Sequence, residues 1–529
     1  MNKNETILLG GASTLTLEDC FKIGNQYAEV HLHPKAKNMM LDSHRVLTDF
    51  LKKRLPVYGS NTHFGNQVNL PDTLLIKDPD EYKEGVNKRQ LNLIESHNCG
   101  LGAEVSQEIV RVTMALRAHC LALGYSGVRP EVAEQLINFI NKKIHPVVRT
   151  YGSVGASGDL IPLSAIASAL CGLETDVYFM NKKVSAQQAI KMAELDKLNP
   201  EVREGLALAN GTSFMTAIAT LAAYKLQRLF NSMLASLALS LEALEIIGDA
   251  HHPLVHTLKR QKGEQEINNF FLNFWKGSQL IKKLDDIRKD ISEKIKNKEI
   301  IEKIPGLQDY YSLRSVAQGF GPFKENLERA VAWIEGEINS VNDNPIISVK
   351  PPKIYHCANF MGYYVTDSCD ILKMDIAQAS TWLHAILANL VHPRKNSGLP
   401  ANLVKQPGIN NGFRPIQILA ASLAVQNRKL AQAQQSFMLP TEGDNQDVNS
   451  LGTHAALDLK KSVDNLEYLV SILLLASVQA LELRGLSLAS LEARKIHRAI
   501  RKVSSFLNSD RSLTVDIEKV VVLMKEHGI

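Results

Sequence analysis

The stretch from Tyr151 to Ala167, which reads YGSVGASGDLIPLSAIA, has the residue types and spacing of a loop that could do chemistry. Three glycines and two serines share its first half, and glycine lets a backbone bend tightly. A serine nucleophile of the G-x-S-x-G type is excluded, because Asp159 stands two positions after Ser157 where that motif needs glycine. A phosphate-binding loop is excluded as well, because no lysine follows the glycines. On residue types alone, the segment is a flexible loop that leads into a helix.

The same segment closely resembles the prosthetic-group loop of the histidine, phenylalanine and tyrosine ammonia-lyases. In that family an Ala-Ser-Gly tripeptide cyclises to 4-methylidene-imidazole-5-one (MIO) with no external cofactor, and the matching residues here are Ala156, Ser157 and Gly158. Their types suit this chemistry, because Gly158 has no side chain to keep its amide nitrogen from the Ala156 carbonyl and Ser157 can lose its hydroxyl as water. An electron-poor methylidene would be the electrophile that no standard side chain provides. The resemblance implies an ammonia-lyase that acts on an aromatic L-amino acid and releases the trans-propenoate.

The resemblance covers nearly the whole chain and implies further catalytic residues. By its match to the family loop in LPVYGSNT, Tyr58 is the base that removes the β-proton. A free tyrosine has a pKa of about 10, so we expect cationic or helix-terminal surroundings to lower it. Asn210, in an Asn-Gly-Thr element, is expected to hold the prosthetic group and the substrate amine region. Without the family context, Tyr58 would be a packed tyrosine beside a turn, and Asn210 a polar helix cap.

Substrate-binding residues are implied in the same way. Arg314, in QDYYSLR, has the planar and permanently charged side chain that suits a carboxylate, although a surface arginine beside aromatic residues is the alternative. Gln308 and Tyr311 would support the prosthetic group and the substrate. The remaining matches are in three short motifs, and they are Asn344 in NDNP, Phe360 after Asn359, and Gln446 in NQDVNSLG.

Selectivity in the family depends on a pair of residues beside the aromatic ring of the substrate, and Ser96 and His97 stand at that pair here. Phenylalanine-specific relatives carry Phe-Leu, whereas a histidine can hydrogen-bond a phenol or an imidazole. Histidine-specific relatives carry a glutamate where this chain has Gln446, and without that carboxylate an imidazolium would lose its ion-pair partner. We therefore expect tyrosine first, histidine second and phenylalanine third.

Two departures from the family pattern bear on the substrate. His63 stands where the loop usually has glycine, and its side chain could narrow the pocket or stiffen the lid. Cys357-Ala358 replaces the usual glycine pair before Asn359-Phe360. Either change could accommodate an unusual substrate.

The chain is expected to be mainly α-helical, with a long helical bundle and a smaller mixed N-terminal region that carries the loop. We place the N-terminal region at 1–205, with the prosthetic-group loop at 152–160, and the helical bundle and oligomerisation core at 206–529. Apolar residues recur at helical spacing over five ranges, namely 215–245, 321–341, 363–392, 415–436 and 453–483. Several of these helices are apolar on more than one face, which favours burial on several sides and a bundle shared between subunits. The resemblance implies a homotetramer whose active sites are built from more than one subunit.

Composition excludes several other functions. The formal net charge of +5 is slight for 529 residues, and the mixed charge run at 282–303 has no aromatic residues for base stacking, so we expect no nucleic-acid partner and read that run as a solvated helix. The uncharged stretch 205–224 contains several polar residues and is expected to be a buried helix rather than a membrane span. No apolar signal segment opens the sequence. We expect a cytoplasmic protein without a membrane partner.

Cysteine and histidine spacing argues against a metal site. The six cysteines show no C-x-x-C spacing, which suits neither a zinc site nor a disulfide framework and is typical of a reducing cytosol. His251, His252 and His256 lie close together, but a zinc site would need further ligands and Pro253 disturbs the helix. We expect these histidines to be surface or interface residues.

Two rival functions remain open. An aromatic amino acid 2,3-aminomutase uses the same prosthetic group but returns ammonia to the β-carbon, and the sequence hardly separates it from a lyase. The rival of another class is a catalytically inactive helical scaffold, which predicts an unmodified loop. We favour the enzyme because Ser157, Tyr58, Asn210 and Arg314 all occur in their motif contexts.

Overall fold

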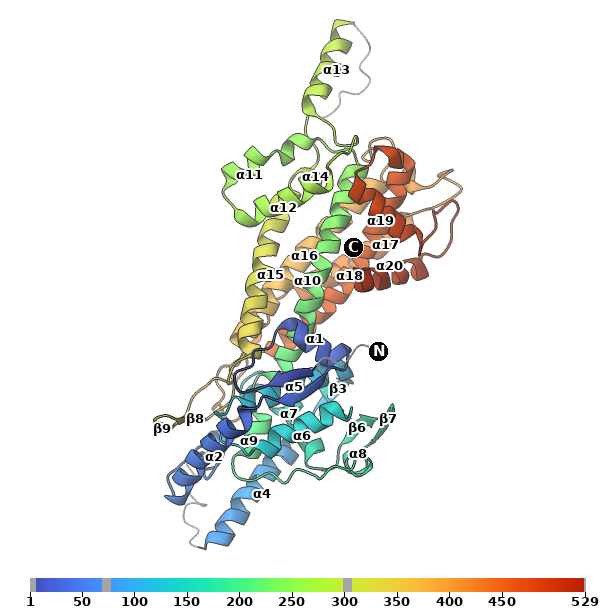
Figure 1. Cartoon of the computed structure of the whole chain (residues 1–529). Helices are drawn as coiled ribbons and strands as arrows, with labels where there is room; N and C mark the ends of the chain where they lie inside the picture. The colour runs from blue at the N-terminus through green and yellow to red at the C-terminus, as the bar shows by residue number, and fades with distance from the viewer. Residues whose placement is uncertain (1–5, 69–77, 298–306, 528–529) are drawn as a thin grey trace. The chain divides into compact units, whose positions relative to one another are not determined.

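The chain forms two compact units, and most of it is helical. The computed structural model describes residues 6–68, 78–297 and 307–527 (Figure 1). The first unit comprises Met1–Tyr224, Ala330–Asp370 and Ala433–Lys460, and the second comprises Lys225–Arg329, Ile371–Gln432 and Lys461–Ile529. The mainly α fold is as predicted. The two units do not follow the predicted division after residue 205, because the four longest helices each contribute residues to both units.

Several helices of the described chain lie wholly within the first unit. They are α1 (Leu17–Asn25), α2 (Ala36–Lys52), α4 (Pro79–His97), α5 (Gln107–Ala122), α6 (Pro130–Asn141), α7 (Leu160–Leu170), α8 (Ala186–Met192) and α9 (Glu204–Ala209). Every residue of α5 from Ile109 to Ala122 is buried, because α1, α2 and α6 pack around it. A helix that is buried on all sides must also satisfy its polar side chains internally, and this applies to Arg111 and Arg117.

Short strands join the helices of the first unit. The parallel pair is β1 (Thr6–Leu9) with β2 (Glu29–Leu32). The antiparallel sheets are β3 (Leu101–Glu104) with β5 (Arg149–Tyr151), β4 (His145–Pro146) with β6 (Asp176–Phe179) and β7 (Lys182–Ser185), and β8 (Ile346–Val349) with β9 (Pro352–Tyr355). Ile347 of β8 shares a buried apolar cluster with Leu47 of α2 and with Val57, so this hairpin is packed against the segment that carries Tyr58.

The second unit is a helical bundle. Its long helices are α10 (Ser213–Ala243), α15 (Val316–Ile338), α16 (Tyr363–Val391), α17 (Arg414–Leu430) and α18 (Gly452–Arg484), and four of them also contribute to the first unit. Ser240 of α10 bonds Ser477 of α18 at 2.7 Å, and Asn427 of α17 bonds both α16 and α18. These helices nearly coincide with the five predicted ranges, except that α15 begins earlier and α17 ends earlier.

Two predictions about uncharged and charged stretches can be compared with the structure. The stretch 205–224 is buried as predicted, but it is not one helix, because α9 ends at Ala209 and α10 begins at Ser213. The charge run forms α13 (Leu284–Lys296), which has no buried residue, as predicted; its part from residue 298 onward lies outside the described residues. One helix of the described chain, α18, is long and apolar enough to cross a membrane by length and composition, and most of its apolar part is buried within the protein.

The predicted surface position of the neighbouring histidines is wrong for two of them. His251 lies in a 3-10 turn before α11 (Pro253–Lys259), and both His251 and His256 are buried. His256 Nδ1 bonds Glu264 of α12 (Lys262–Phe274) at 2.7 Å, and its Nε2 lies 3.2 Å from the Ala250 carbonyl. The burial of these two histidines was not predictable from the sequence, because it depends on the packing of α12 against α11 in the folded chain. His252 is exposed and caps α11 by accepting from the Leu254 amide.

Candidate active site

The loop between β5 and α7 folds back on itself through its own polar groups. Gly155 and Gly158 both have φ of +69°, a backbone conformation that favours glycine. Ser153 Oγ accepts from the Gly155 amide at 3.2 Å and donates to Asp159 Oδ1 at 2.8 Å. Ala156 is 5% exposed and Gly158 is buried, whereas Ser157 is half-buried. The serine is therefore the accessible member of a tripeptide that is otherwise enclosed.

Gly158 is held directly against Gly211. The two residues form an isolated parallel bridge, and the Asp159 amide donates to the Gly211 carbonyl at 2.8 Å. A Cβ atom at Gly158 would overlap that carbonyl, so only glycine fits here. This close approach brings the Asn-Gly-Thr element onto the loop.

Asn210 links three of the predicted site segments. Its Nδ2 donates to the Ser157 carbonyl at 2.9 Å, and its Oδ1 accepts from the Asn344 amide at 2.9 Å. Asn344 Oδ1 in turn accepts from the Cys357 amide at 2.7 Å. The bond to its oxygen polarises the Asn210 amide, which makes its N–H a better donor toward Ser157. Cys357, one of the two residues that replace the usual glycine pair, thus enters the site through its backbone.

The motif around Gln446 closes over the other side of the loop. Gln446 Nε2 lies 3.4 Å from Ser157 Oγ, and Thr441 orients the amide by donating to its Oε1 at 2.6 Å. The Leu451 amide donates to the Val154 carbonyl at 3.0 Å. Thr441 therefore orients the Gln446 side chain, and the segment that follows Gln446 is bonded to the loop.

Tyr58 is half-buried, and its surroundings differ from those predicted. Its hydroxyl accepts from the Gly65 amide at 3.1 Å, and its own amide donates to His356 Nε2 at 3.2 Å. Burial raises the pKa of Tyr58; the charge of Glu442 adds to this rise, and the Gly65 amide and Arg203 oppose it. The predicted lowering of the Tyr58 pKa is wrong, because the effect of burial outweighs the opposing effects of the Gly65 amide and of the Arg203 charge.

The selectivity pair ends α4. His97 Nδ1 lies 2.9 Å from the Leu93 carbonyl one turn earlier, and Ser96 Oγ also bonds that carbonyl at 3.2 Å. A carbonyl can only accept, so Nδ1 carries the proton, and in the neutral ring Nε2 is an acceptor. His97 is thus oriented to receive a hydrogen bond from a donor.

Three predicted residues belong to the second unit, whereas the loop belongs to the first. Gln308 and Tyr311 are exposed, with Tyr311 at 76%. The Arg314 guanidinium lies over the Tyr311 ring at 4.7 Å from its centroid, within the short helix α14 (Tyr311–Arg314). Trp382 fixes this helix by donating to the Ser312 carbonyl at 2.7 Å.

Phe360 and His63 are described by the contacts of their neighbours in the sequence. Asn359 Nδ2 donates to the Val341 carbonyl at 3.0 Å and sets the position of Phe360, which is half-buried. His63 is half-buried beside Thr62, whose hydroxyl donates to the His63 carbonyl at 2.9 Å.

Sequence reasoning missed several buried supports. Asp159 accepts from the Phe214 and Met215 amides at 3.1 and 2.8 Å and from the Thr453 hydroxyl, so it fixes the start of α10 to the loop. Gln90 bonds the Gly59 carbonyl and the Leu206 amide, which fixes the Tyr58 loop to α4 and α9. The position of Asp159 directly after the tripeptide was the one available signal.

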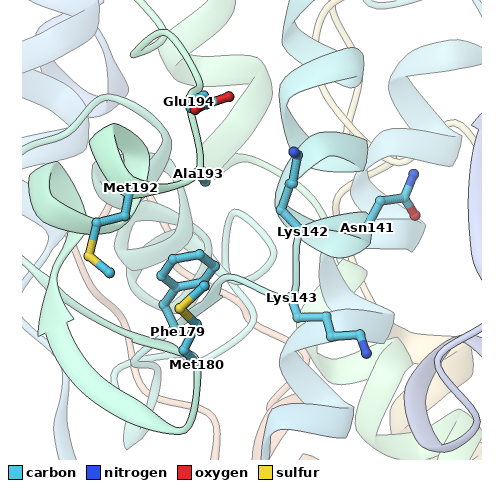
Figure 2. Close-up of a pocket in the computed structure, with 8 residues that line it drawn as sticks. All are labelled: Asn141, Lys142, Lys143, Phe179, Met180, Met192, Ala193 and Glu194. Carbon is cyan, nitrogen blue, oxygen red and sulfur yellow. The ribbon is translucent and has the colours of Figure 1, made fainter.

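A separate cavity lies in the first unit. Its volume is about 440 Å³. Figure 2 shows its lining residues at the end of α6, at the β6–β7 turn and at the end of α8. Its lining residues are Asn141, Lys142, Lys143, Phe179, Met180, Met192, Ala193 and Glu194. None of them is a predicted catalytic or substrate-binding residue.

Comparison with known proteins identifies the family. A family model described as aromatic amino acid lyase matches residues 15–502. The chain belongs to the aromatic amino acid lyase family. This family member is 33% identical to a histidine ammonia-lyase of Alkaliphilus metalliredigens over 515 residues, covering 97% of this chain and 96% of that one. It is 35% identical to a tyrosine 2,3-aminomutase of Myxococcus fulvus over 485 residues, covering 90% and 89%.

Solved structures agree with this assignment. The Pantoea agglomerans phenylalanine aminomutase is 27% identical with a TM-score of 0.90, and the match covers 99% of this chain and 100% of that one. The histidine ammonia-lyase of Trypanosoma cruzi is 26% identical with a TM-score of 0.86, covering 98% and 93%. The relatives of this family member therefore include both lyases and aminomutases.

Proposed function

We propose that this protein is an ammonia-lyase that removes ammonia from an aromatic L-amino acid and releases the trans-propenoate. The observation that carries the proposal is the 2.9 Å hydrogen bond from Asn210 Nδ2 to the Ser157 carbonyl, within a loop that Gly158 and Gly211 press together. A serine elbow or a flexible linker would need neither contact. The loop is built to hold one specific backbone conformation.

The tripeptide fits the prosthetic group that its family implies. Gly158 lacks a side chain, so its nitrogen can bond to the Ala156 carbonyl carbon; the Ala156 oxygen then leaves as water with the amide hydrogens of Ser157 and Gly158. A second water takes the Ser157 hydroxyl and its Cα hydrogen, which leaves an exocyclic methylene. The MIO group so formed would supply the electrophile that captures the amino group.

The other residues have roles that their contacts support. Asn210 stabilises negative charge that develops at the Ser157 oxygen, since its donor is already oriented there. Tyr58 is the base for the β-proton, and its raised pKa means that it needs further help to ionise when substrate is bound. In the second unit, Arg314 would bind the substrate carboxylate, with Gln308 and Tyr311 beside it in the sequence. In the first unit, Asn344, Phe360 and Gln446 are the proposed substrate-binding residues.

Tyrosine is the proposed first substrate, with histidine second and phenylalanine third. His97 offers Nε2 as an acceptor because Leu93 holds the proton on Nδ1, and a phenol is a donor that matches it. The amide of Gln446 has no charge to pair with an imidazolium. Coumarate, urocanate and cinnamate absorb at different wavelengths, so an ultraviolet assay against the three amino acids ranks them directly.

The second candidate function is an aromatic amino acid 2,3-aminomutase. The 35% identity to the tyrosine 2,3-aminomutase of Myxococcus fulvus supports this candidate. Both reactions begin with the same elimination. Chromatography of the products separates them, since a β-amino acid identifies the mutase and a propenoate the lyase. An inactive scaffold would yield neither product and would keep its encoded mass.

We propose a homotetramer in the cytoplasm, with sites completed by more than one subunit. Apolar side chains on α17 support an assembly, since Ile418 is 69%, Leu419 42% and Val425 46% exposed. All six cysteines lie in the described part of the chain and none forms a disulfide, which suits a reducing compartment. Light scattering on purified protein gives the assembly, and cell fractionation gives the compartment.

Intact-mass spectrometry tests the central proposal. The purified chain should be lighter than its sequence by two water molecules, and a peptide digest should place the loss on residues 156–158. An unmodified chain that is also inactive against all three amino acids would refute the lyase and the mutase together.

A further inference from the structure

The side of Asn210 that faces away from Ser157 is occupied by a buried arginine, Arg117 of α5. Its side chain is 1% exposed. Nη1 donates to the Asn210 backbone carbonyl at 2.7 Å, and Nη2 donates to Cys120 Sγ at 2.6 Å. In the part of the chain that the structure describes, no carboxylate forms an ion pair with Arg117. A buried guanidinium without such a partner is costly, so its few hydrogen bonds matter.

The guanidinium occupies space that any side chain at Gly211 would need. A Cβ atom there would overlap Arg117 Nη1 and approach Asn342 Oδ1. On the other side of Gly211, its carbonyl accepts a hydrogen bond from the Asp159 amide at 2.8 Å. The two successive carbonyls of Asn210 and Gly211 are thus fixed, one by Arg117 and the other by the residue that follows the tripeptide.

Fixing this backbone decides where the Asn210 side chain begins. From that point its Nδ2 reaches the Ser157 carbonyl and its Oδ1 reaches the Asn344 amide, both at 2.9 Å. A small rotation of the Asn210–Gly211 peptide would break one or both bonds, because a short amide side chain has little reach to compensate. Even a small displacement of a group that contacts the reacting atoms can reduce the reaction rate strongly.

We propose that Arg117 is a positioning residue for the prosthetic loop, which holds the Asn210–Gly211 backbone so that the Asn210 amide meets the Ser157 carbonyl. This inference rests on the proposed function. Without Arg117 the tripeptide spends less time in the conformation that brings Gly158 nitrogen to the Ala156 carbonyl. More chains then remain unmodified, and the modified chains turn over more slowly with little change in KM.

The alternative is that Arg117 only caps helix α9, since Asn210 is the C-cap residue of that helix. The same helix α5 offers a matched control. Arg111 is also 1% exposed and donates to the Ile23 and Ile140 carbonyls at 2.9 and 2.7 Å, near the ends of α1 and α6. Arg111 thus supports the fold in a similar way but makes no contact with Asn210.

The experiment compares Arg117→Met with Arg111→Met in the full chain. Methionine keeps much of the volume of the arginine stem and removes every donor. Each variant is measured for the fraction of chains that lack two waters, for its thermal midpoint, and for kcat and KM. We expect Arg117→Met to contain unmodified chains and to lose roughly tenfold to a hundredfold in kcat per modified chain, with KM nearly unchanged. Arg111→Met should lower the thermal midpoint while remaining fully modified.

Three results would overturn the proposal. They are full modification with wild-type kcat in Arg117→Met, equal losses of modification in both variants, and a change confined to KM. Should a methionine variant be insoluble, Arg117→Lys and Arg111→Lys provide the same comparison, and Arg117→Lys should recover part of the modification because it keeps a charged donor. A wild-type chain without any water loss would instead refute the proposed function itself, so the two failures are distinguishable.

Discussion

The side-chain amide of Asn210 donates to the carbonyl of Ser157 at 2.9 Å across 53 residues of sequence. This single bond joins the two motifs that carry most of the chemical argument, the Ala-Ser-Gly tripeptide and the Asn-Gly-Thr element. Gly158 of the first motif lies directly against Gly211 of the second, and a Cβ atom at either position would overlap neighbouring atoms. This contact explains why both motifs have glycine there.

Replacing Ser157 by alanine should abolish turnover while leaving the fold intact. Alanine has no hydroxyl to lose, so the exocyclic methylene cannot form, and the side chain is half-buried and small enough to be replaced without strain. The variant should keep the wild-type circular dichroism spectrum. Ser164→Ala is the matched control, because Ser164 is buried in the adjacent helix α7 and makes no hydrogen bond through its hydroxyl in the described chain. Wild-type rates in Ser157→Ala would end the proposed mechanism.

Tyr58→Phe should keep the two-water loss and still lower kcat about a hundredfold or more, the usual contribution of a general base. The pH profile gives an independent check. A base works when deprotonated, and burial raises the pKa of Tyr58, so kcat/KM should rise with pH into the alkaline range. The rise should disappear in Tyr58→Phe and persist in Tyr125→Phe, a partly exposed tyrosine elsewhere. An acid limb that survives in Tyr58→Phe would assign the base to another group.

The long helices were predictable because their apolar residues repeat at helical spacing over many turns. Helix α16 (Tyr363–Val391) and helix α18 (Gly452–Arg484) nearly match their predicted ranges for this reason. The start of α15 was placed too late, because Pro322 reads as a boundary although it lies inside the helix.

Site residues were predictable where they belong to a short sequence motif whose residue types suit the chemistry. Ser157, Asn210, Asn344 and Gln446 are joined in one hydrogen-bonded network, although their catalytic roles stay predictions. Arg117 was not predictable, because its bond to Asn210 spans 93 residues and an arginine in an apolar helix carries no local signal. The same limit explains the surroundings of Tyr58, since desolvation is a property of the folded chain.

His97→Phe should shift the substrate preference toward phenylalanine. The change removes the Nε2 acceptor that the bond between Nδ1 and Leu93 orients, and it offers an apolar surface to an apolar ring. A missing hydrogen-bond partner in a substrate pocket can change a kcat/KM ratio by several powers of ten, so the ratio for tyrosine over phenylalanine should fall at least about tenfold. His97→Gln, which keeps a polar head, should change the ratio less. A tyrosine preference that persists in His97→Phe would show that the selectivity pair lies elsewhere.

The buried pair of His256 and Glu264 makes a prediction about stability in the second unit. The two side chains are 1% and 3% exposed and meet at 2.7 Å, and the other ring nitrogen of His256 faces the Ala250 carbonyl. Carboxylate and carbonyl oxygens both accept hydrogen bonds, so each ring nitrogen of His256 faces an acceptor, and the contact with Glu264 is the shorter one. His256→Ala leaves the buried Glu264 side chain without this hydrogen-bond partner and should lower the free energy of unfolding by about 1–3 kcal/mol, measured by urea denaturation. His252→Asn keeps an acceptor at the exposed cap of α11 and should change it by less than about 1 kcal/mol. If both changes lower the free energy of unfolding by the same small amount, the buried contact of His256 with Glu264 does not stabilise the fold measurably.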